Sequence, residues 1–431
     1  MIGRFTATGV VIASMVGTGV FVSLGYQADS VKSTFAILLL WVLGGIYALC
    51  GAFCYAELVA RMPRSGGEYH FLSRIYHPAL GFMAGWATVT VGFAAPTAVA
   101  ALAFASYMGI FEPDLNQQWI AAGMILLCGC IHLGKAEIGR FFQNGFTATK
   151  IVLLAGFAAA FFFMTANPQP VNLLPVQADF NSVLTLEFAT AFVFVTYSFS
   201  GWNAAVYIAG EIRNAKQVVP YALLGGTTLV LVLYLLLNYA FLQSIPFSEI
   251  EALESKEKIA ALAASKIFSS EGEAISNILI AIGLVSTIGA LLFLGPRISQ
   301  TIGEDFKALD FLARKNRNGT PITAIVSQLF LSILFVFLAN LKSILLYVEF
   351  TLISFSFLTV LGLFLVRRKS TESFEGYMAW GFPWTAHLFL LLSGWVLVSV
   401  FSRHTQESLV GLLTILAGLV LYYVSSREPV K

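Results

Sequence analysis

Apolar residues in this chain are collected into long runs that alternate with short polar segments. A helix needs about 20 mostly apolar residues to cross the hydrocarbon core of a bilayer. Twelve runs meet or approach this length, and they are residues 5–24, 35–60, 79–108, 119–133, 146–164, 184–212, 223–243, 275–295, 322–338, 344–366, 383–401 and 409–424. The pattern predicts an all-α polytopic membrane protein with twelve transmembrane helices. After the seventh run, residues 248–268 predict a further helix on the surface.

Two of the predicted spans are interrupted near their middle by small and hydroxyl-bearing residues. The interruptions are Ala13-Ser14-Met15-Val16-Gly17-Thr18-Gly19 in the first span and Thr196-Tyr197-Ser198-Phe199-Ser200-Gly201 in the sixth. Irregular backbone at membrane depth is tolerated only where it is buried in protein or lines a cavity. Broken helices at corresponding positions of two halves indicate the substrate site of a secondary transporter. We therefore expect a five-plus-five inverted repeat formed by residues 1–165 and 184–366, with two accessory helices in residues 383–424.

The composition agrees with a membrane protein. Hydrophobic residues make up 58% of the chain and charged residues 11%, whereas soluble domains average about 25% charged residues. If the N-terminus is cytoplasmic, only six of the 25 lysines and arginines fall on the outer side, namely Lys32, Lys256, Lys258, Lys266, Lys342 and Arg403. Basic residues concentrate in cytoplasmic loops, so this sorting predicts a plasma-membrane protein with both termini in the cytoplasm. The first run lacks a small-residue cleavage pattern, and we expect it to be a span rather than a signal peptide.

Two further features limit the chemistry. The four cysteines lie in apolar runs without ligand spacing to histidines, so we expect neither a disulfide nor a metal site, and no cofactor. The five histidines are scattered, which argues against a membrane-embedded enzyme, and a phosphate-binding glycine loop with lysine is absent from the sequence. A channel needs a continuous polar pore, whereas polarity here is confined to the two interruptions.

The interruptions themselves suggest the chemistry of a ligand. Unwinding frees the amides of Gly17, Thr18 and Gly19 at the positive end of a half-helix, where a carboxylate is stabilised. Freed carbonyls near Ala13, Ser14, Tyr197 and Ser198 can accept hydrogen bonds from an ammonium group. Together these groups match an α-amino acid zwitterion. The alternative is a pair of glycine kinks that allow close helix packing.

Several motifs resemble the amino acid–polyamine–organocation (APC) superfamily. Ala13-Ser14-Met15-Val16-Gly17-Thr18-Gly19-Val20-Phe21 is similar to its first-helix signature, and Tyr55-Ala56-Glu57-Leu58 with Arg61-Met62-Pro63-Arg64-Ser65-Gly66-Gly67-Glu68-Tyr69 is similar to its loop after the second helix. Ser200-Gly201-Trp202-Asn203, followed by Gly210-Glu211-Ile212-Arg213-Asn214, resembles the L-type amino acid transporter branch. Arg314-Lys315-Asn316 with Gly319-Thr320-Pro321 is similar to the run into the ninth helix. The resemblance implies a LeuT-type fold, with helices 1 and 6 unwound at mid-membrane.

The resemblance also implies roles for individual residues. Tyr197 stands where the family carries an aromatic gate over the substrate, although core packing is the alternative. Lys150 is a charged residue within the fifth span, and such residues are functional unless they extend to the interface. In sodium-coupled relatives a cation lies between the first and eighth helices, and the resemblance implies that the Lys150 ammonium replaces it near Ser14, Ser286 and Thr287. We expect Tyr234 to bond either the broken first helix or a neighbouring helix carbonyl.

Other charged residues are harder to assign from the sequence. Glu349 lies early in the tenth span and is either a protonatable coupling group or, as we expect, a solvated residue near the outer surface, outside the core site. Glu57, Glu211 and Arg297 are candidates for a cytoplasmic gate, with interfacial solvation as the alternative.

Departures from the family pattern bear on substrate and partners. Ala13 and Ser200 stand where glycine is usual, which narrows the site and favours small or medium side chains. Residues 106–118 contain no cysteine, so no disulfide-linked heavy chain is expected, and a stand-alone bacterial-type carrier fits best.

These features predict a carrier of neutral L-amino acids that works by alternating access, through sodium-independent exchange or facilitated transport. A proton-coupled amino acid or amine symporter is the first alternative, and an amino acid sensor without net transport is the second.

Overall fold

The computed structural model describes residues 2–109, 115–133, 136–177, 179–183, 185–253, 256–268, 270–338, 341–369 and 374–426. Leu184, which begins the sixth predicted span, lies outside these residues, as do Lys135, Arg427 and Lys431 of the charge distribution. The described residues are helical apart from turns, loops and one parallel bridge between Ile2 and Ile212. The all-helical class predicted from the hydrophobic runs is thus confirmed.

Within the described residues, nine helical segments are long and apolar enough to cross a membrane. They are α1 (Arg4–Met15) with α2 (Thr18–Ser30), α3 (Thr34–Arg61), α5 (Pro78–Ala87) with η1 (Thr88–Ala94) and α6 (Ala95–Met108), α8 (Ala136–Met164), α11 (Ala215–Ser244), α14 (Ser270–Asp305), α17 (Leu341–Lys369), α18 (Trp384–Arg403) and α19 (Thr405–Ser425). Three shorter apolar helices, α7 (Gln117–Leu133), α9 (Leu186–Phe199) and α16 (Ile322–Leu338), coincide with the other predicted spans. The chain is a multi-pass membrane protein, and the count of twelve spans stays a prediction.

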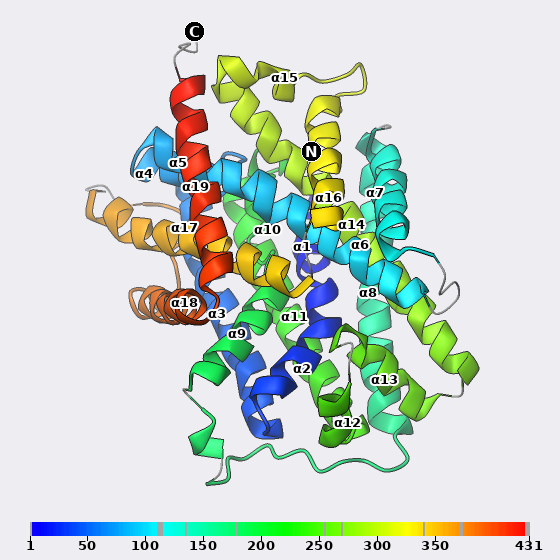
Figure 1. Cartoon of the computed structure of the whole chain (residues 1–431). Coiled ribbons are helices and arrows are strands. Elements are labelled where there is room, and N and C mark those ends of the chain that lie inside the picture. The colour runs from blue at the N-terminus through cyan, green and yellow to red at the C-terminus, as the bar shows by residue number, and fades with distance from the viewer. Residues whose placement is uncertain are drawn as a thin grey trace.

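The helices that carry the interruptions lie in the middle of the molecule. α11 packs along α3 and α1, while α2 packs against α9. On another side, α14 packs along α6 and contacts α1 and α8. The final helices α18 and α19 lie against this assembly, α18 beside α3 and α17, and α19 beside α5 and α17 (Figure 1). Nearly all of the α1–α2 segment is buried, so its interruption is enclosed by other helices.

The first interruption is short. α1 ends at Met15 and α2 begins at Thr18, which leaves Val16 in an extended conformation and Gly17 in an irregular one. A Cβ atom on Gly19 would lie 2.6 Å from the Cα atom of Ser198, so Gly19 lets α2 and α9 approach closely. Gly19 therefore has a packing role in addition to its position at the interruption.

The second interruption lies later in the sequence than predicted. Thr196, Tyr197, Ser198 and Phe199 remain in α9, and the helix ends at Ser200. Gly201 follows with φ of +97°, a conformation that other residues rarely adopt. The short helices α10 (Ala204–Tyr207) and η3 (Ala209–Glu211) come next. The predicted break at Thr196 to Gly201 is therefore corrected to the segment from Ser200 to Asn203.

The connection between α11 and α14 also differs from the prediction. Instead of one surface helix over residues 248–268, it contains α12 (Phe247–Ala252), η4 (Lys256–Lys258) and α13 (Ile259–Ile267), with residues 254–255 outside the described part. Lys256 pairs with Asp29 at the end of α2, and Lys32 pairs with Glu251. These ion pairs hold the connection over the far end of the first span.

Four short helices complete the structure. α4 (Glu68–Ile75) lies between α3 and α5 in the chain, and η2 (Asp179–Asn181) precedes α9. η5 (Lys307–Leu309) and α15 (Asp310–Ala313) follow α14. Of these, α4 packs on α5 and α17.

Candidate substrate site between the interrupted helices

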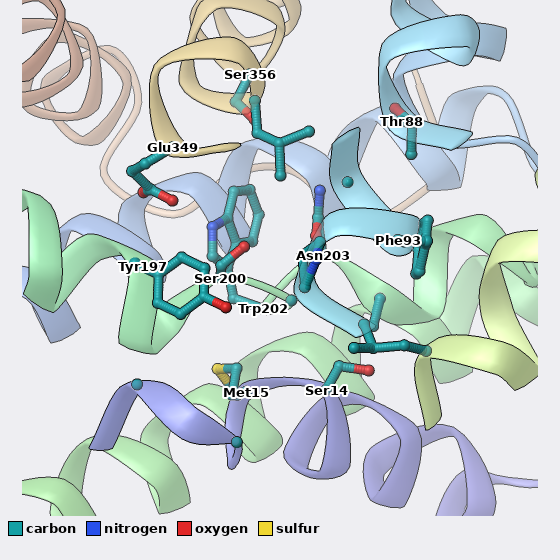
Figure 2. A pocket seen from close by; sticks show the side chains of 18 of the residues that line it. Ser14, Met15, Thr88, Phe93, Tyr197, Ser200, Trp202, Asn203, Glu349 and Ser356 are labelled. Carbon is teal, nitrogen blue, oxygen red and sulfur yellow. The ribbon is translucent and has the colours of Figure 1, made fainter. Parts of the chain in front are cut away.

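A cavity lies between the two interruptions and is closed by η1, α4, α14 and α17 (Figure 2). The predicted site residues that line it are Ser14, Met15, Gly17, Thr18, Gly19, Tyr197, Ser200, Gly201 and Thr287. The two interruptions touch here, because a Cβ atom on Gly201 would lie 2.8 Å from the Cβ atom of Ser14. Residues almost 190 positions apart in the sequence thus form one wall of the cavity.

Other predicted binding residues do not line the cavity and instead pack against the helices that form its wall. Phe199 packs its ring against Trp41 and Tyr234. The Ser198 hydroxyl bonds with the Ser23 hydroxyl at 2.8 Å and donates to the Phe194 carbonyl. Ala13 and Val16 also lie outside the lining. These residues support the backbone around the cavity in the structure, and their contact with a substrate stays a prediction.

Lys150 lies behind the first interruption. Its ammonium group donates hydrogen bonds to the carbonyl oxygens of Val16 at 2.6 Å and Ala13 at 3.0 Å, and to the Thr287 hydroxyl at 2.9 Å. The side chain is 2% exposed. These oxygen atoms from α1, its break and α14 surround the ammonium as they would surround a bound cation.

Two other residues expected around Lys150 do not contact it in the described structure. The Ser286 hydroxyl is buried and has no hydrogen-bond partner among the described residues. The Ser14 hydroxyl donates to the Val10 carbonyl of its own helix at 2.8 Å. The predicted group of Ser14, Ser286 and Thr287 is therefore corrected to Thr287 and the carbonyls of Ala13 and Val16.

Tyr234 links the two interrupted helices from the opposite direction. Its hydroxyl lies 2.6 Å from the Met15 carbonyl oxygen and 3.0 Å from that of Ser198. A hydroxyl has one proton to donate, so the two carbonyls share it. The side chain is fully buried and does not line the cavity.

Several carbonyls that we expected to be free already accept protein hydrogen bonds. The Lys150 side chain donates to the Ala13 carbonyl, and the Tyr234 hydroxyl donates to the Ser198 carbonyl. The Tyr197 carbonyl accepts from the amide of Ser200 at 2.9 Å. A carbonyl oxygen has a second lone pair, so each can accept another hydrogen bond. The first amides of α2, beginning at Thr18, have no partner within the helix, and they lie at its positive end.

Tyr197 lines the cavity from the last turn of α9. Its hydroxyl faces the side chain of Thr18, and in Figure 2 its ring lies between Glu349 and Met15. Tyr26 stacks on Phe194, one turn earlier in α9, with ring centroids 5.0 Å apart. Tyr197 is thus positioned between the first interruption and α17.

A carboxylate at another wall of the cavity was not predicted to belong to the site. Glu68, the first residue of α4, accepts hydrogen bonds from the Tyr55 hydroxyl at 2.8 Å and the Asn203 amide at 2.7 Å. Burial raises the pKa of Glu68, while hydrogen bonds from Tyr207, Tyr55 and Asn203 act in the opposite direction. Glu68 and Asn203 both lie in motifs that resemble the family, which could have marked them as site residues. The sequence does not indicate that their side chains contact each other.

Glu349 also belongs to the cavity, contrary to our expectation of a solvated position near the outer surface. Its side chain is 3% exposed, and it lines the same cavity as Tyr197 and Ser200. The rotation of α17 explains the difference, since this helix packs on α9, α6 and η1 with Glu349 turned inward.

The expected cytoplasmic gate is divided between two separate ion-pair groups. Arg297 in α14 binds Glu211 at 2.7 Å, next to the bridge between Ile2 and Ile212. Glu57 does not take part, because it is fully buried and binds Arg61 in α3 and Arg367 in α17. Glu57 therefore joins α3 to α17, and the predicted group is reduced to Glu211 and Arg297.

The sequence also matches known proteins over almost its whole length. Residues 2–422 match the model of the family described as amino acid permease. The chain is similar to the human b(0,+)-type amino acid transporter 1, with 26% identity over 98% of this chain and 87% of that protein. It is 26% identical to the serine/threonine exchanger SteT of Bacillus subtilis over 98% of this chain and 96% of SteT. The mouse large neutral amino acids transporter small subunit 2 is 25% identical over 98% of this chain and 80% of its own length.

Proposed function

The chain belongs to the amino acid permease family, and we propose that it carries neutral L-amino acids across the plasma membrane by alternating access. The observation that carries this proposal is the meeting of two interrupted helices at one cavity. The amino end of α2 offers unpaired amides to a carboxylate, and the carbonyls at the end of α1 and α9 retain lone pairs for an ammonium group. An α-amino acid presents these two groups on one carbon atom.

Transport is proposed to be sodium-independent, by exchange or facilitated movement. The support is the Lys150 ammonium, which donates to three oxygen atoms at the position proposed for a cation in sodium-coupled relatives. The hydrogen bonds from Lys150 already occupy these oxygen atoms, so a sodium ion at the same place would have to displace them. The similarity to a serine/threonine exchanger is consistent with the exchange mode.

The proposed mechanism moves one group of helices against the others. In the LeuT-type arrangement of residues 1–165 and 184–366, the spans formed by α1–α2, α3, α9 and α11 rock against the remainder. Tyr197 would close the site on the outer side, and the Glu211–Arg297 pair would close the cytoplasmic side. Both termini are proposed to be cytoplasmic, and the carrier to work without a disulfide-linked heavy chain.

Exchange measurements in proteoliposomes test the proposal. Vesicles loaded with an unlabelled amino acid are tested for uptake of a labelled panel, with and without sodium and at two pH values. We expect uptake of neutral L-amino acids that requires internal substrate and has the same rate with and without sodium. Uptake that rises with an inward proton gradient would support a proton-coupled symporter, and binding without counterflow would support a sensor.

A further inference from the structure

A second cavity lies outside the substrate site, between the last turns of α3, α4 and α17. Its volume is about 390 Å³, which lies within the range of about 300–1,000 Å³ for small-molecule sites. Three basic side chains line it, Arg61 at the end of α3, Arg74 in the last turn of α4 and Lys369 at the end of α17. The other described residues that line it are apolar, among them Ile75 and Phe374. We call this site the basic cavity.

The basic cavity lies at one end of two membrane-spanning helices. α3 and α17 are both long and apolar enough to cross a bilayer. An ion pair between Glu57 and Arg367 joins their last turns, so both helices end at the same face of the membrane. α4 packs on α17 (Figure 1), and the side chains of Arg74 and Lys369 are exposed. Basic side chains at the ends of spans reach the level of the lipid head groups, so the basic cavity is accessible to them.

The positive charges of the basic cavity exceed the negative ones. Glu57 is shared by Arg61 and Arg367, so these three groups together carry one net positive charge. Arg74 and Lys369 form no ion pair with any residue that the structure describes. Basic residues are common at the cytoplasmic ends of spans, but here they surround a cavity without an acidic residue among its described lining. This arrangement attracts an anion.

Arg61 is held so that part of its guanidinium group remains available. Its Nε and Nη2 atoms lie 2.9 Å and 2.8 Å from the Glu57 carboxylate, and its Cζ atom lies 4.1 Å from the centre of the Phe374 ring. A guanidinium group has five N–H donors, and those on Nη1 remain for a ligand. Glu375 follows Phe374 in the chain but does not line the basic cavity, so it does not compete for these donors.

We propose that the basic cavity binds the phosphate group of an anionic phospholipid such as phosphatidylglycerol. Arginine binds phosphate oxygens in pairs and lysine binds them as a point charge, and basic pockets between membrane helices bind anionic head groups. Met62, Leu365 and Val366 share the cavity and offer apolar surface to the glycerol backbone and first methylene groups of a lipid. This apolar part favours a lipid over a free phosphate ion. A bound head group links α3, α4 and α17 and therefore stabilises the protein.

Ligands that separate the charge of the head group from the acyl chains test the inference on the unaltered protein. The full chain, purified in neutral detergent, is titrated with dioleoylphosphatidylglycerol, with zwitterionic dioleoylphosphatidylcholine, or with glycerol 3-phosphate, which has the phosphate but no acyl chains. The melting temperature reports stabilisation, and native mass spectrometry counts the lipids that stay bound. We expect phosphatidylglycerol to raise the melting temperature at about tenfold lower concentration than phosphatidylcholine. Glycerol 3-phosphate at equal concentration should have little effect.

Salt gives a second measurement without any mutation. Raising the salt from about 0.1 M to about 1 M shortens the Debye length from about 10 Å to about 3 Å. Binding of phosphatidylglycerol should weaken over this range, while binding of phosphatidylcholine should change little.

The double variant Arg74→Gln with Lys369→Gln removes the two unpaired charges at exposed positions. We expect its apparent affinity for phosphatidylglycerol to fall about tenfold or more, and its melting temperature without lipid to stay near that of the unaltered protein. Lys315→Gln with Arg317→Gln is the matched control, because it removes one lysine and one arginine at exposed positions that do not line the basic cavity. The control should retain the affinity of the unaltered protein.

Each of several results would overturn the inference. Equal stabilisation by phosphatidylglycerol and phosphatidylcholine would show that the head group charge is not read. Stabilisation by glycerol 3-phosphate at the same concentration would identify a free phosphate ester, and not a lipid, as the occupant. Equal losses in the two double variants would mean that net charge alone attracts the lipid. If the Arg74→Gln, Lys369→Gln protein fails to fold, the lipid and salt comparisons on the unaltered protein decide. None of these measurements uses transport, so a failure of the proposed function leaves their outcome unchanged.

Discussion

The ammonium nitrogen of Lys150 lies 2.6 Å from the carbonyl oxygen of Val16, so that α8 holds the unwound segment between α1 and α2. Val16 is one of only two residues outside regular helix at this interruption. A carbonyl without a helical partner needs another donor when it is buried. Lys150 supplies that donor, and this gives the lysine a structural task in addition to its proposed electrostatic one.

Replacing Lys150 with alanine is expected to reduce exchange strongly. The change removes the buried donor shared by three oxygen atoms, of which the Val16 carbonyl keeps a hydrogen bond from Thr287 at 3.3 Å. A hydrogen bond to a charged group contributes roughly 1.5–3 kcal/mol, so a loss of at least about tenfold in exchange rate is expected. Lys216→Ala, at an exposed position of α11, is the control. Unchanged rate and unchanged ion dependence in Lys150→Ala would remove the lysine from the mechanism.

Tyr234→Phe tests the link between the two interruptions. Loss of the hydroxyl removes the donor shared by the Met15 and Ser198 carbonyls, which should destabilise the protein by about 1–3 kcal/mol. The melting temperature and the exchange rate in proteoliposomes are both expected to fall. Tyr239→Phe in the same helix is the control, because the Tyr239 hydroxyl makes no hydrogen bond to a described residue and its ring packs on Phe162. Equal melting temperatures for the two variants would contradict the link.

The positions of the long helices were predictable because the bilayer imposes a length. The runs at residues 223–243 and 344–366 lie within α11 and α17, whose ends extend further into polar sequence. The first interruption was also predictable, since Gly17 breaks a strongly apolar run. The second was placed too early because Ser198 looked like a breaker, whereas its hydroxyl bonds the Phe194 carbonyl four residues back and stays in the helix.

The inner surface of the cavity was less accessible to sequence reasoning. A charged residue near the end of a span can face either solvent or a buried site. Which of the two Glu349 faces is set by the rotation of α17, and that rotation depends on packing against other helices. The contact of Glu68 with Asn203 joins residues 135 positions apart. The π-helix η1, which brings Thr88, Gly92 and Phe93 to the cavity, has no evident signal in its sequence.

Gly201→Ala is expected to disrupt the contact between the interruptions. Gly201 has φ of +97°, and an added Cβ atom would lie 2.8 Å from the Ser14 Cβ atom and 2.9 Å from its carbonyl carbon. Both the backbone conformation and the space therefore oppose the substitution, and a loss of roughly 1–3 kcal/mol is expected from the backbone alone. Gly225→Ala is the control, since nothing lies within 4 Å of its added Cβ atom. A Gly201→Ala protein with normal melting temperature and normal substrate affinity would show that the contact is dispensable.

Stability in acid should depend on His70, a buried residue of α4. Burial lowers the pKa of His70 from its ordinary value of 6.5 to about 4, with the cations of Arg64 and Arg74 acting in the same direction and Asp305 opposing them. The folded protein therefore keeps His70 neutral while the unfolded chain takes up a proton below pH 6.5. Because the unfolded state binds more protons in this range, stability is lost as the pH falls from 6.5 toward 4.

The variant His70→Gln lacks this proton uptake, so its melting temperature should fall less steeply than that of the unaltered protein between pH 6.5 and 4. The difference between the two proteins isolates His70 from other groups that titrate in the same range. His387→Gln, at an exposed position, should retain the steep dependence. Parallel curves for His70→Gln and the unaltered protein would mean that His70 is protonated in the folded state, so that burial in α4 does not exclude its charge.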